Sequence, residues 1–259
     1  MNGMTNTELR HFGELLWAMT EKELRARYKH TVFGFLWLIA NPLLQMLIIG
    51  FVFPLFVKEP VKYYDYFLFT GLLAWNFFSL SLSKATPSIV YERSLIKKAV
   101  FPRAVIPISI ILSNLINYVA AFILFLVPLL FLNTLTLMSA WYFLCGLITL
   151  VLFTIGTSLL TSALNVRYRD INFFVQAILI IWFYATPIVY ALSQIPPRLL
   201  WLWRFNPLTS SIQFMQAAVV GSELPGPAML ASNMLITLAI TILGILTFHR
   251  ESKFFDDWL

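Results

Sequence analysis

The chain has 259 residues, of which 59% are hydrophobic and 12% are charged, and its formal net charge is +6. Soluble domains contain about 45–50% apolar and about 25% charged residues, so this composition excludes a soluble globular enzyme. The positive charge does not indicate nucleic-acid binding, because no stretch combines clustered Lys and Arg with a soluble fold that could present them to a groove. The single cysteine, Cys145, excludes a disulfide within the chain, and the three separated histidines predict no metal site.

Residues 1–30 predict an amphipathic helix that lies along the cytoplasmic membrane interface. Thr5 and Glu8 fit a capping box that would start this helix. At about 100° per residue one stripe is apolar and the opposite side is charged. The apolar stripe consists of Leu9, Phe12, Leu15, Leu16 and Met19. The stripe ends near Glu23 and Arg27, where we expect the helix to leave the lipid or to meet another protein. A soluble helical arm without a function is the alternative.

Six charge-poor runs predict transmembrane helices, because about 20 apolar residues cross the hydrocarbon core of a bilayer. They lie near residues 31–57, 66–87, 104–132, 140–166, 171–194 and 228–248. The third and fourth divide one stretch, 104–166, that contains no Asp, Glu, Lys, Arg or His, and a turn is expected at 133–136. The predicted fold is therefore an all-α polytopic membrane protein, in which residues 31–259 form one six-span domain.

The distribution of Lys and Arg predicts that both termini are cytoplasmic. Fourteen of the 18 basic residues lie in segments 1–30, 84–103, 167–170 and 249–259, and four lie in the opposite loops. Loops rich in Lys and Arg stay on the cytoplasmic side of a membrane. Aromatic residues at 63–66 and 201–203 then fall on the outer side, where Tyr and Trp anchor helices at the headgroups.

The cytoplasmic loop of residues 84–103 is expected to carry motion from a partner protein into the spans. Pro87 and Pro102 bracket a predicted short helix through Tyr91, Glu92 and Arg93. A helix bounded by prolines moves as a unit, and its charged side chains can pair with a partner surface. The alternative is that the charges of this loop only set the orientation of the protein.

Residues 195–227 predict an outer re-entrant helical hairpin between the fifth and sixth spans. The segment contains Pro196-Pro197 and Asn206-Pro207, and its apolar pieces, 199–205 and 208–220, are too short to span a membrane. Non-helical backbone at membrane depth needs protein or water around it, so we expect the hairpin to line or cap a cavity. A surface lid without a role in transport is the alternative.

The predicted spans contain neutral polar and aromatic side chains but no charged residue near their middle. An ion-coupled transporter needs charged side chains at that depth, so the sequence disfavours one. The third span carries Asn114, Asn117, Tyr118 and Phe125 at spacings that place them on one face. Amides and aromatic rings suit a hydroxyl-rich substrate, so these four are candidates for lining a channel. Asn also joins helices to each other in lipid, which is the alternative for each.

The sequence predicts neither catalytic residues nor a nucleotide site. No lysine follows a glycine, so the phosphate-binding loop of Walker ATPases is absent. Paired carboxylates and a His/Asp cluster, which acid–base catalysis would need, are absent as well. The sequence therefore favours a conduit that binds no cofactor or metal and obtains its energy from a partner.

Four segments of the chain resemble ABC-2 type exporter permeases, in the order in which that family carries them. The first is Arg27-Tyr28-Lys29 followed by Phe33-Gly34-Phe35-Leu36-Trp37 and Asn41-Pro42. The second is Lys97-Lys98-Ala99-Val100-Phe101-Pro102-Arg103, followed by Pro107. The third is Asn165-Val166-Arg167-Tyr168-Arg169-Asp170, and the fourth contains Thr186-Pro187, Pro196 and Asn206-Pro207-Leu208. The polysaccharide-exporting branch of the family, in particular its O-antigen permeases, is the most similar.

The resemblance implies a homodimer with a continuous channel in the bacterial inner membrane. It also implies two copies of an ATPase subunit on the cytoplasmic face, which hold the ATP and Mg²⁺, and a lipid-linked polysaccharide as cargo. A periplasmic gate would include Pro196, Pro197, Asn206 and Pro207. The residues expected to couple to the ATPase are Tyr91, Glu92, Arg93, Lys97, Lys98, Arg167, Arg169 and Asp170.

Three alternatives to this function remain from the sequence. Teichoic-acid and capsule permeases share the same motifs, which leaves the cargo open within the polysaccharide branch. A small-lipid or drug exporter of the ABC-2 family is a nearby alternative, and an intramembrane glycan or lipid transferase is a distant one. The missing acid–base cluster counts against the transferase.

Overall fold

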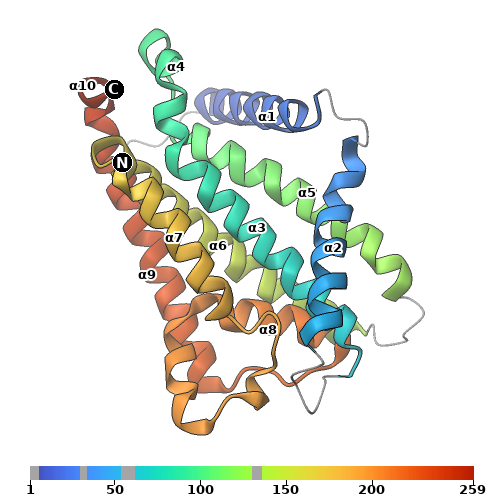
Figure 1. Cartoon of the computed structure of the whole chain (residues 1–259). Helices are drawn as coiled ribbons and strands as arrows, with labels where there is room; N and C mark the ends of the chain where they lie inside the picture. The colour runs from blue at the N-terminus through green and yellow to red at the C-terminus, as the bar shows by residue number, and fades with distance from the viewer. Residues whose placement is uncertain (1–5, 30–33, 54–61, 130–135) are drawn as a thin grey trace.

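Four long helices form the body of the protein. A computed structural model describes residues 6–29, 34–53, 62–129 and 136–259, which contain helices and no strand (Figure 1). The long helices are α3 (Tyr64–Tyr91), α5 (Val105–Leu129), α6 (Leu137–Arg167) and α9 (Pro227–Glu251). Each is long and apolar enough to cross a membrane. They correspond to the predicted spans at 66–87, 104–132, 140–166 and 228–248, and the chain is a multi-pass membrane protein.

The other two predicted spans are shorter apolar helices. Helix α2 (Trp37–Val52) follows a short 3-10 turn at Gly34–Leu36, and α7 covers Asp170–Tyr184. The ends of the predicted span 31–57 lie outside the described residues. The span predicted at 171–194 is too long, because Thr186-Pro187 follows α7: proline lacks an N–H and disfavours the α conformation at the residue before it.

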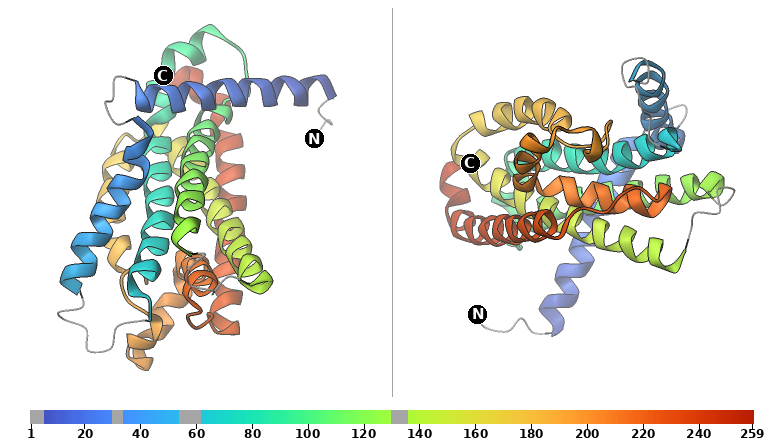
Figure 2. Two further views of the ribbon diagram at one scale, coloured as in Figure 1. Left: turned by 90° about the vertical axis from the view of Figure 1, so that its right-hand side faces the viewer. Right: turned by 90° about the horizontal axis from the view of Figure 1, so that it is seen from below.

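Helix α1 (Asn6–Tyr28) lies across one end of the bundle (Figure 2). The described part of its apolar stripe, from Phe12 to Met19, packs against protein at this end, and Met19 is 8% exposed. The described stripe residues contribute to a separate hydrophobic cluster, which we call the end cluster. It contains Met19, Ile89, Ile96, Val105, Ile106, Leu159, Ala163, Val166, Phe248, Phe255 and Leu259, with Phe12, Leu15 and Leu16 packed against it. The end cluster therefore joins α1 to the ends of α3, α5, α6 and α9.

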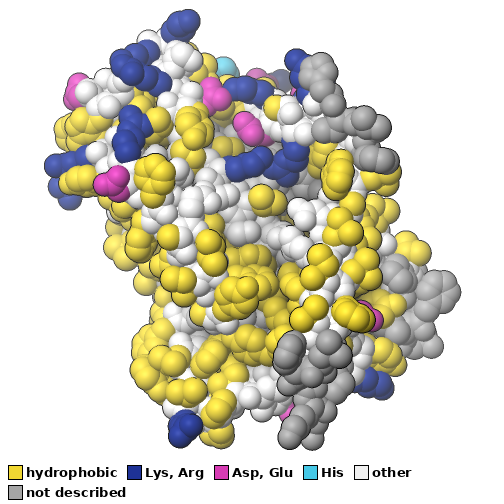
Figure 3. All heavy atoms as spheres, in the orientation of Figure 1, with side chains coloured by type: hydrophobic (Ala, Val, Ile, Leu, Met, Phe, Trp, Pro, Cys, Tyr) yellow, Lys and Arg dark blue, Asp and Glu magenta, His cyan; other side chains and the backbone are white. Residues whose placement is uncertain are grey.

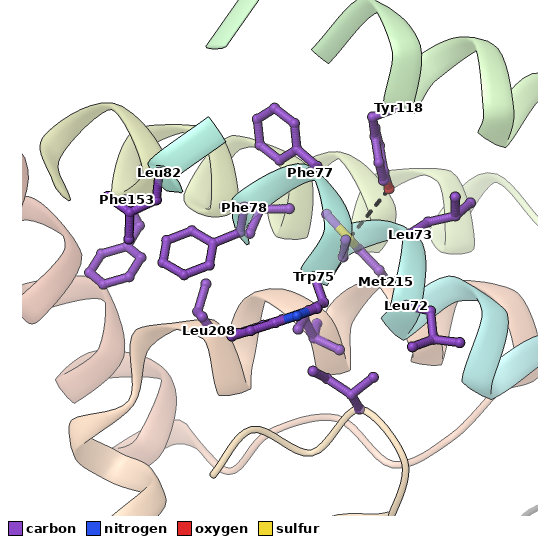
Figure 4. Close-up of a cluster of buried hydrophobic side chains, with 14 of the residues drawn as sticks. Leu72, Leu73, Trp75, Phe77, Phe78, Leu82, Tyr118, Phe153, Leu208 and Met215 are labelled. Atoms are coloured by element: carbon purple, nitrogen blue, oxygen red, sulfur yellow. Dashed lines mark hydrogen bonds between the residues drawn. The ribbon is translucent and has the colours of Figure 1, made fainter. Parts of the chain in front are cut away.

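The centre of the bundle is filled by the side chains of α3. Phe78 stacks on Phe153 of α6 with ring centroids 5.7 Å apart, and it meets the edge of Trp182 of α7. Leu208 and Met215 reach the same cluster from α8 (Pro207–Val220), as Figure 4 shows. The described side chains of this cluster are buried and pack closely against one another.

The predicted outer hairpin contains two helical pieces of different character. Residues 197–205 form a 3-10 helix, η5 (Pro197–Phe205), without a buried side chain. Helix α8 follows and packs across the end of the bundle opposite α1, against α3, α6 and α9. All its side chains except that of Phe214 are buried. The apolar piece predicted at 208–220 is thus an internal helix of the bundle.

The C-terminal segment folds back onto the end that carries α1. Arg103, just before α5, donates to the carbonyl oxygen of Ser252 and to the carboxylate of Asp256 in α10 (Phe255–Trp258). Its guanidinium lies 5.9 Å from the ring centroid of Phe255, within the range of a cation–π contact. Arg167 lies 5.3 Å from the ring centroid of Trp258. The segment therefore connects the two loops that precede α5 and α7.

The surface divides into charged and apolar zones. Lys and Arg side chains gather at the end that carries α1 and α4 (Arg93–Lys98), and apolar side chains cover much of the middle (Figure 3). Large apolar residues are exposed on α2, α5, α6, α7 and α9. An apolar surface this extensive is typical of contact with lipid.

Candidate functional site

Three of the four channel-lining candidates come together with the end of α1. Asn114, Asn117 and Tyr118 are 3%, 5% and 4% exposed. Arg27 donates to the Oδ1 of Asn114, whose Nδ2 donates to Ser81 Oγ at 3.1 Å. These bonds join α5 to α1 and α3, so the polar face of α5 takes part in packing within the chain.

Two tyrosines extend this polar network. The hydroxyl of Tyr28 donates to the Oδ1 of Asn117 at 3.0 Å. Burial raises the pKa of the Tyr28 phenol, although the neighbouring Arg27 opposes the shift, so the phenol stays protonated as a donor. The hydroxyl of Tyr118 points to the sulfur of Met215 at 3.6 Å. The fourth candidate, Phe125, lies farther along α5 and packs on Phe69 with ring centroids 4.3 Å apart.

A cavity of about 360 Å³ lies where these helices meet, and we call it the α1–α5 cavity. Arg27 and Tyr28 of α1, Asn76 and Lys84 of α3, and Asn114, Asn117 and Tyr118 of α5 line it together with the start of α2. Periodicity along α5 predicted the polar face. It could not predict that the end of α1 closes the same cavity.

The predicted ATPase-coupling residues gather at the α1 end of the bundle. Tyr91, Arg93, Lys97 and Lys98 of the first loop are exposed. Arg167, Arg169 and Asp170 of the second loop are exposed as well. These side chains form a charged surface at one end of the molecule.

The short helix of the first loop begins later than predicted. Pro87 lies inside α3, which continues to Tyr91, and α4 begins at Arg93. Proline removes one backbone hydrogen bond from a helix, which destabilises it. Packing offsets this loss at Pro87, because residues 85–89 are all buried. The prediction that Pro87 bounds the short helix is therefore wrong.

Glu92 links the first loop to α1. Its carboxylate accepts from the Nζ of Lys22 at 2.7 Å. Beside this pair, a groove of about 620 Å³ separates α1 from α4, and we call it the α1–α4 groove. His11, Leu15, Lys22, Leu95 and Lys98 are among the residues that line it. The groove combines apolar and charged side chains, as a surface for a protein partner does.

The predicted gate residues lie at the opposite end and differ in burial. Pro196 and Pro197 are exposed, whereas Asn206 is 9% exposed. The Oδ1 of Asn206 accepts from Trp182 Nε1 and from the backbone N–H of Leu208. Through the second of these bonds Asn206 caps the start of α8. Its Nδ2 donates to the carbonyl of Ala185 and to the hydroxyl of Thr186. Asn206 therefore holds the end of α7 against the start of α8, where Pro207 occupies the first turn.

Replacing Asn206 by leucine should destabilise this end of the protein by on the order of 3 kcal/mol, because several buried polar groups lose their partners. Thermal unfolding of the purified chain, followed by tryptophan fluorescence, measures the effect. Pro196→Ala is the matched control, since Pro196 is exposed in the same segment. Equal melting temperatures for Asn206→Leu and the control would contradict the role assigned to Asn206.

The described residues contain no group of three or more His, Cys, Asp and Glu side chains that could hold a metal ion. Cys145 is a free, half-buried thiol within α6.

Comparison with known proteins gives consistent matches over nearly the whole chain. Residues 14–220 match the ABC-2 type transporter family. An O-antigen export system permease protein, RfbA, of Klebsiella pneumoniae is 35% identical over 249 residues, which cover 95% of each chain. A second RfbA of K. pneumoniae is 38% identical over 77% of each chain. RfbA of Myxococcus xanthus is 32% identical over 94% of this chain and 95% of its own. These matches confirm the resemblance found in the four sequence segments.

Proposed function

This chain belongs to the ABC-2 type transporter family, and from that premise we propose that it is the permease subunit of an ATP-driven polysaccharide exporter. Its cargo in this proposal is an O-antigen-like polysaccharide linked to a lipid. The observation that carries the proposal is the similarity to an O-antigen export permease over 95% of both chains.

The packing of α3 supports a channel between two copies of the chain. Phe69, Leu72 and Phe78 are at most 1% exposed, and side chains of α5, α6 and α8 enclose them. A polysaccharide cannot pass through a centre packed to this density. We therefore propose a homodimer whose channel forms between the two bundles.

The proposed energy source is a pair of ATPase subunits that bind at the α1 end. The absence of a phosphate-binding loop from the sequence supports a separate ATPase. The α1–α4 groove and the exposed side chains of both loops offer a docking surface. In this arrangement ATP and Mg²⁺ belong to the partner.

The proposed location is the bacterial inner membrane, with both termini and the α1 end on the cytoplasmic side. Loops rich in Lys and Arg face the cytoplasm, which supports this orientation. The four long helices would span the bilayer together with α2 and α7, and α1 would lie along the interface. Helix α8 and η5 would then form the outer gate at the periplasmic end.

Purified alone, the chain should hydrolyse no ATP, and it should co-purify with a Walker-motif ATPase when both are expressed in their native host. Reconstituted with that ATPase, the complex should hydrolyse ATP faster when a glycan-lipid is added and should not respond to drugs. A complex whose Walker lysine is replaced serves as the inactive control. Turnover by a preparation free of other polypeptides, or stimulation by drugs only, would contradict the proposal.

A further inference from the structure

The α1–α5 cavity is positively charged and contains no acidic side chain. Arg27 and Lys84 are the charged residues among those that line it. In the described part of the chain, neither forms an ion pair with a carboxylate. The two cations repel each other, and the carboxylate of Glu23 offsets the charge of Lys84 only in part. An anion bound between Arg27 and Lys84 would relieve the remaining repulsion.

Hydrogen-bond donors surround the same space. Arg27 donates one N–H to the amide oxygen of Asn114. Because this amide is neutral, the bond does not compensate the positive charge of the guanidinium. The Nδ2 of Asn117, a residue that is 5% exposed, is buried and has no partner among the described residues. Guanidinium, ammonium and amide N–H groups together form the donor set that phosphate oxygens accept from most strongly.

Apolar side chains form most of the cavity wall toward α2. Trp37, Pro42, Leu73, Phe77 and Leu80 line it beside the charged groups, together with the amides of Asn41 and Asn76. On the adjoining surface of α2, the side chains of Leu44, Leu47, Ile48 and Phe51 are exposed. The cavity thus presents a cationic side near α1 and an apolar side that continues toward the lipid-facing surface, which suits an amphiphile with an anionic headgroup.

We propose that the α1–α5 cavity binds the phosphate-ester headgroup of the lipid that carries the cargo, with Arg27 and Lys84 as its charged ligands. This inference rests on the proposed function, because it assigns the lipid end of the cargo to a place in the permease. Two cations match the two or more negative charges of a diphosphate ester better than the single charge of a membrane phospholipid. The cavity thus distinguishes the cargo lipid from the surrounding bilayer by charge.

Binding is tested on the full chain in nanodiscs of zwitterionic phosphatidylcholine, with radiolabelled farnesyl diphosphate as the probe. Arg27→Gln and Lys84→Gln should each weaken binding by about tenfold, because each removes one charge-assisted contact. Lys253→Gln is the matched control: it makes the same change in net charge at the same end of the molecule, and Lys253 is exposed outside the cavity. Equal affinity of the two cavity variants and the control would overturn the proposal.

Asn114→Asp provides a variant that keeps the local packing. The new carboxylate would pair with Arg27, which already contacts this position, so the fold should be retained. The same carboxylate would repel an anion, and binding of farnesyl diphosphate should fall by more than about tenfold. Unchanged binding by Asn114→Asp would contradict the proposed position of the headgroup.

Competition identifies the source of the phosphate. Farnesol should not compete with the probe, and inorganic diphosphate should compete at least about tenfold more weakly than unlabelled farnesyl diphosphate, because it lacks the apolar chain. Equal competition by inorganic diphosphate would show a site for a free anion, and equal competition by phosphatidylglycerol would show a general phospholipid site. Either result would overturn the assignment to the cargo lipid.

The outcome separates this inference from the proposed function. The binding assay contains no ATPase and requires no transport. Export that persists without a cavity-dependent lipid site would refute the inference and leave the permease function intact. A cavity-dependent lipid site in a chain that associates with no ATPase would refute the proposed function and leave the site in place.

Discussion

Exchanging the two charges that precede and begin α4, with Glu92→Lys and Arg93→Glu in one variant, should abolish polysaccharide export while membrane insertion stays normal. The net charge of the loop does not change, so its cytoplasmic orientation is preserved. The exchange places a lysine against Lys22 in place of the present ion pair, and it inverts the charge of the exposed Arg93 toward the proposed ATPase. Surface polysaccharide and ATP hydrolysis by the reconstituted complex measure the effect.

Loss of export by this variant cannot be attributed to unfolding. The side chains of Lys22 and Glu92 are 55% and 26% exposed, and a pair this exposed contributes no more than about 1 kcal/mol to stability. The melting temperature should therefore change little, whereas export should fall by about tenfold or more and ATP hydrolysis should fall or become uncoupled from transport.

A matched control exchanges another adjacent acid–base pair at the same end, with Arg250→Glu and Glu251→Lys. These two residues form only a long ion pair of 3.8 Å near the end of α9, so export should persist. A second variant combines Lys22→Glu with Glu92→Lys, which restores the ion pair between α1 and the loop with its charges reversed. Because Arg93 is unchanged in it, this variant separates the role of the ion pair from the role of Arg93. Normal export by the first variant would place the coupling contact elsewhere, in α1 or at residues 167–170.

The long helices could be predicted from the sequence because one physical requirement determines them. A segment without charges over 20 or more residues is stable only in lipid or in a protein interior, so the spans are visible as charge-free runs. The boundaries depend on local chemistry as well. Thr136 caps α6 through a reciprocal bond with Ser139, and residues 133–135 of the predicted turn lie outside the described residues. At the end of α7, Pro187 stops the helix earlier than the charge-free run indicates.

The polar face of α5 could be predicted from its spacing, but its surroundings could not. Arg27 and Tyr28 reach Asn114 and Asn117 across 87 and 89 residues of sequence, and helical periodicity contains no information about such contacts. Helical periodicity also extends the predicted polar face of α5 too far along the helix. Phe125 is three turns from Asn114, about 16 Å along the helix axis, and it packs on Phe69 beyond the cavity.

The burial of α8 was missed for a related reason. The short apolar pieces predict a hairpin that lines or caps a cavity, yet Thr209, Ser210, Ser211 and Gln216 are at most 4% exposed. Several of these side chains bond to neighbouring helices: Asn233 of α9 donates to Ser210, and Ser211 to Thr149 of α6. Polar side chains at membrane depth can join helices as well as line water, and composition does not distinguish the two.

The contact between α6 and α9 is so close that only glycine fits at its centre. A Cβ built on Gly156 would lie 2.6 Å from the Cα of Thr241, and one built on Gly244 would lie closer still to the carbonyl oxygen of Gly156. At the same crossing, Thr241 Oγ1 donates to the carbonyl of Leu152 at 3.0 Å. In lipid, helices associate mainly through van der Waals packing and interhelical hydrogen bonds, so close approach of the backbones is a main source of stability here.

Replacing Gly244 by alanine should therefore lower the stability of the protein by on the order of 3 kcal/mol, because the methyl group forces the two helices apart. Gly13→Ala is the matched control. It lies in a helix with nothing within 4 Å of its added Cβ, and alanine in a helix interior is more stable than glycine by about 0.5–1 kcal/mol. The same substitution should thus act in opposite directions at the two positions, measured by thermal unfolding of the purified chain. A Gly244→Ala protein that melts at or above the wild-type temperature would refute the close packing of α6 on α9, since backbone entropy alone would then determine the effect.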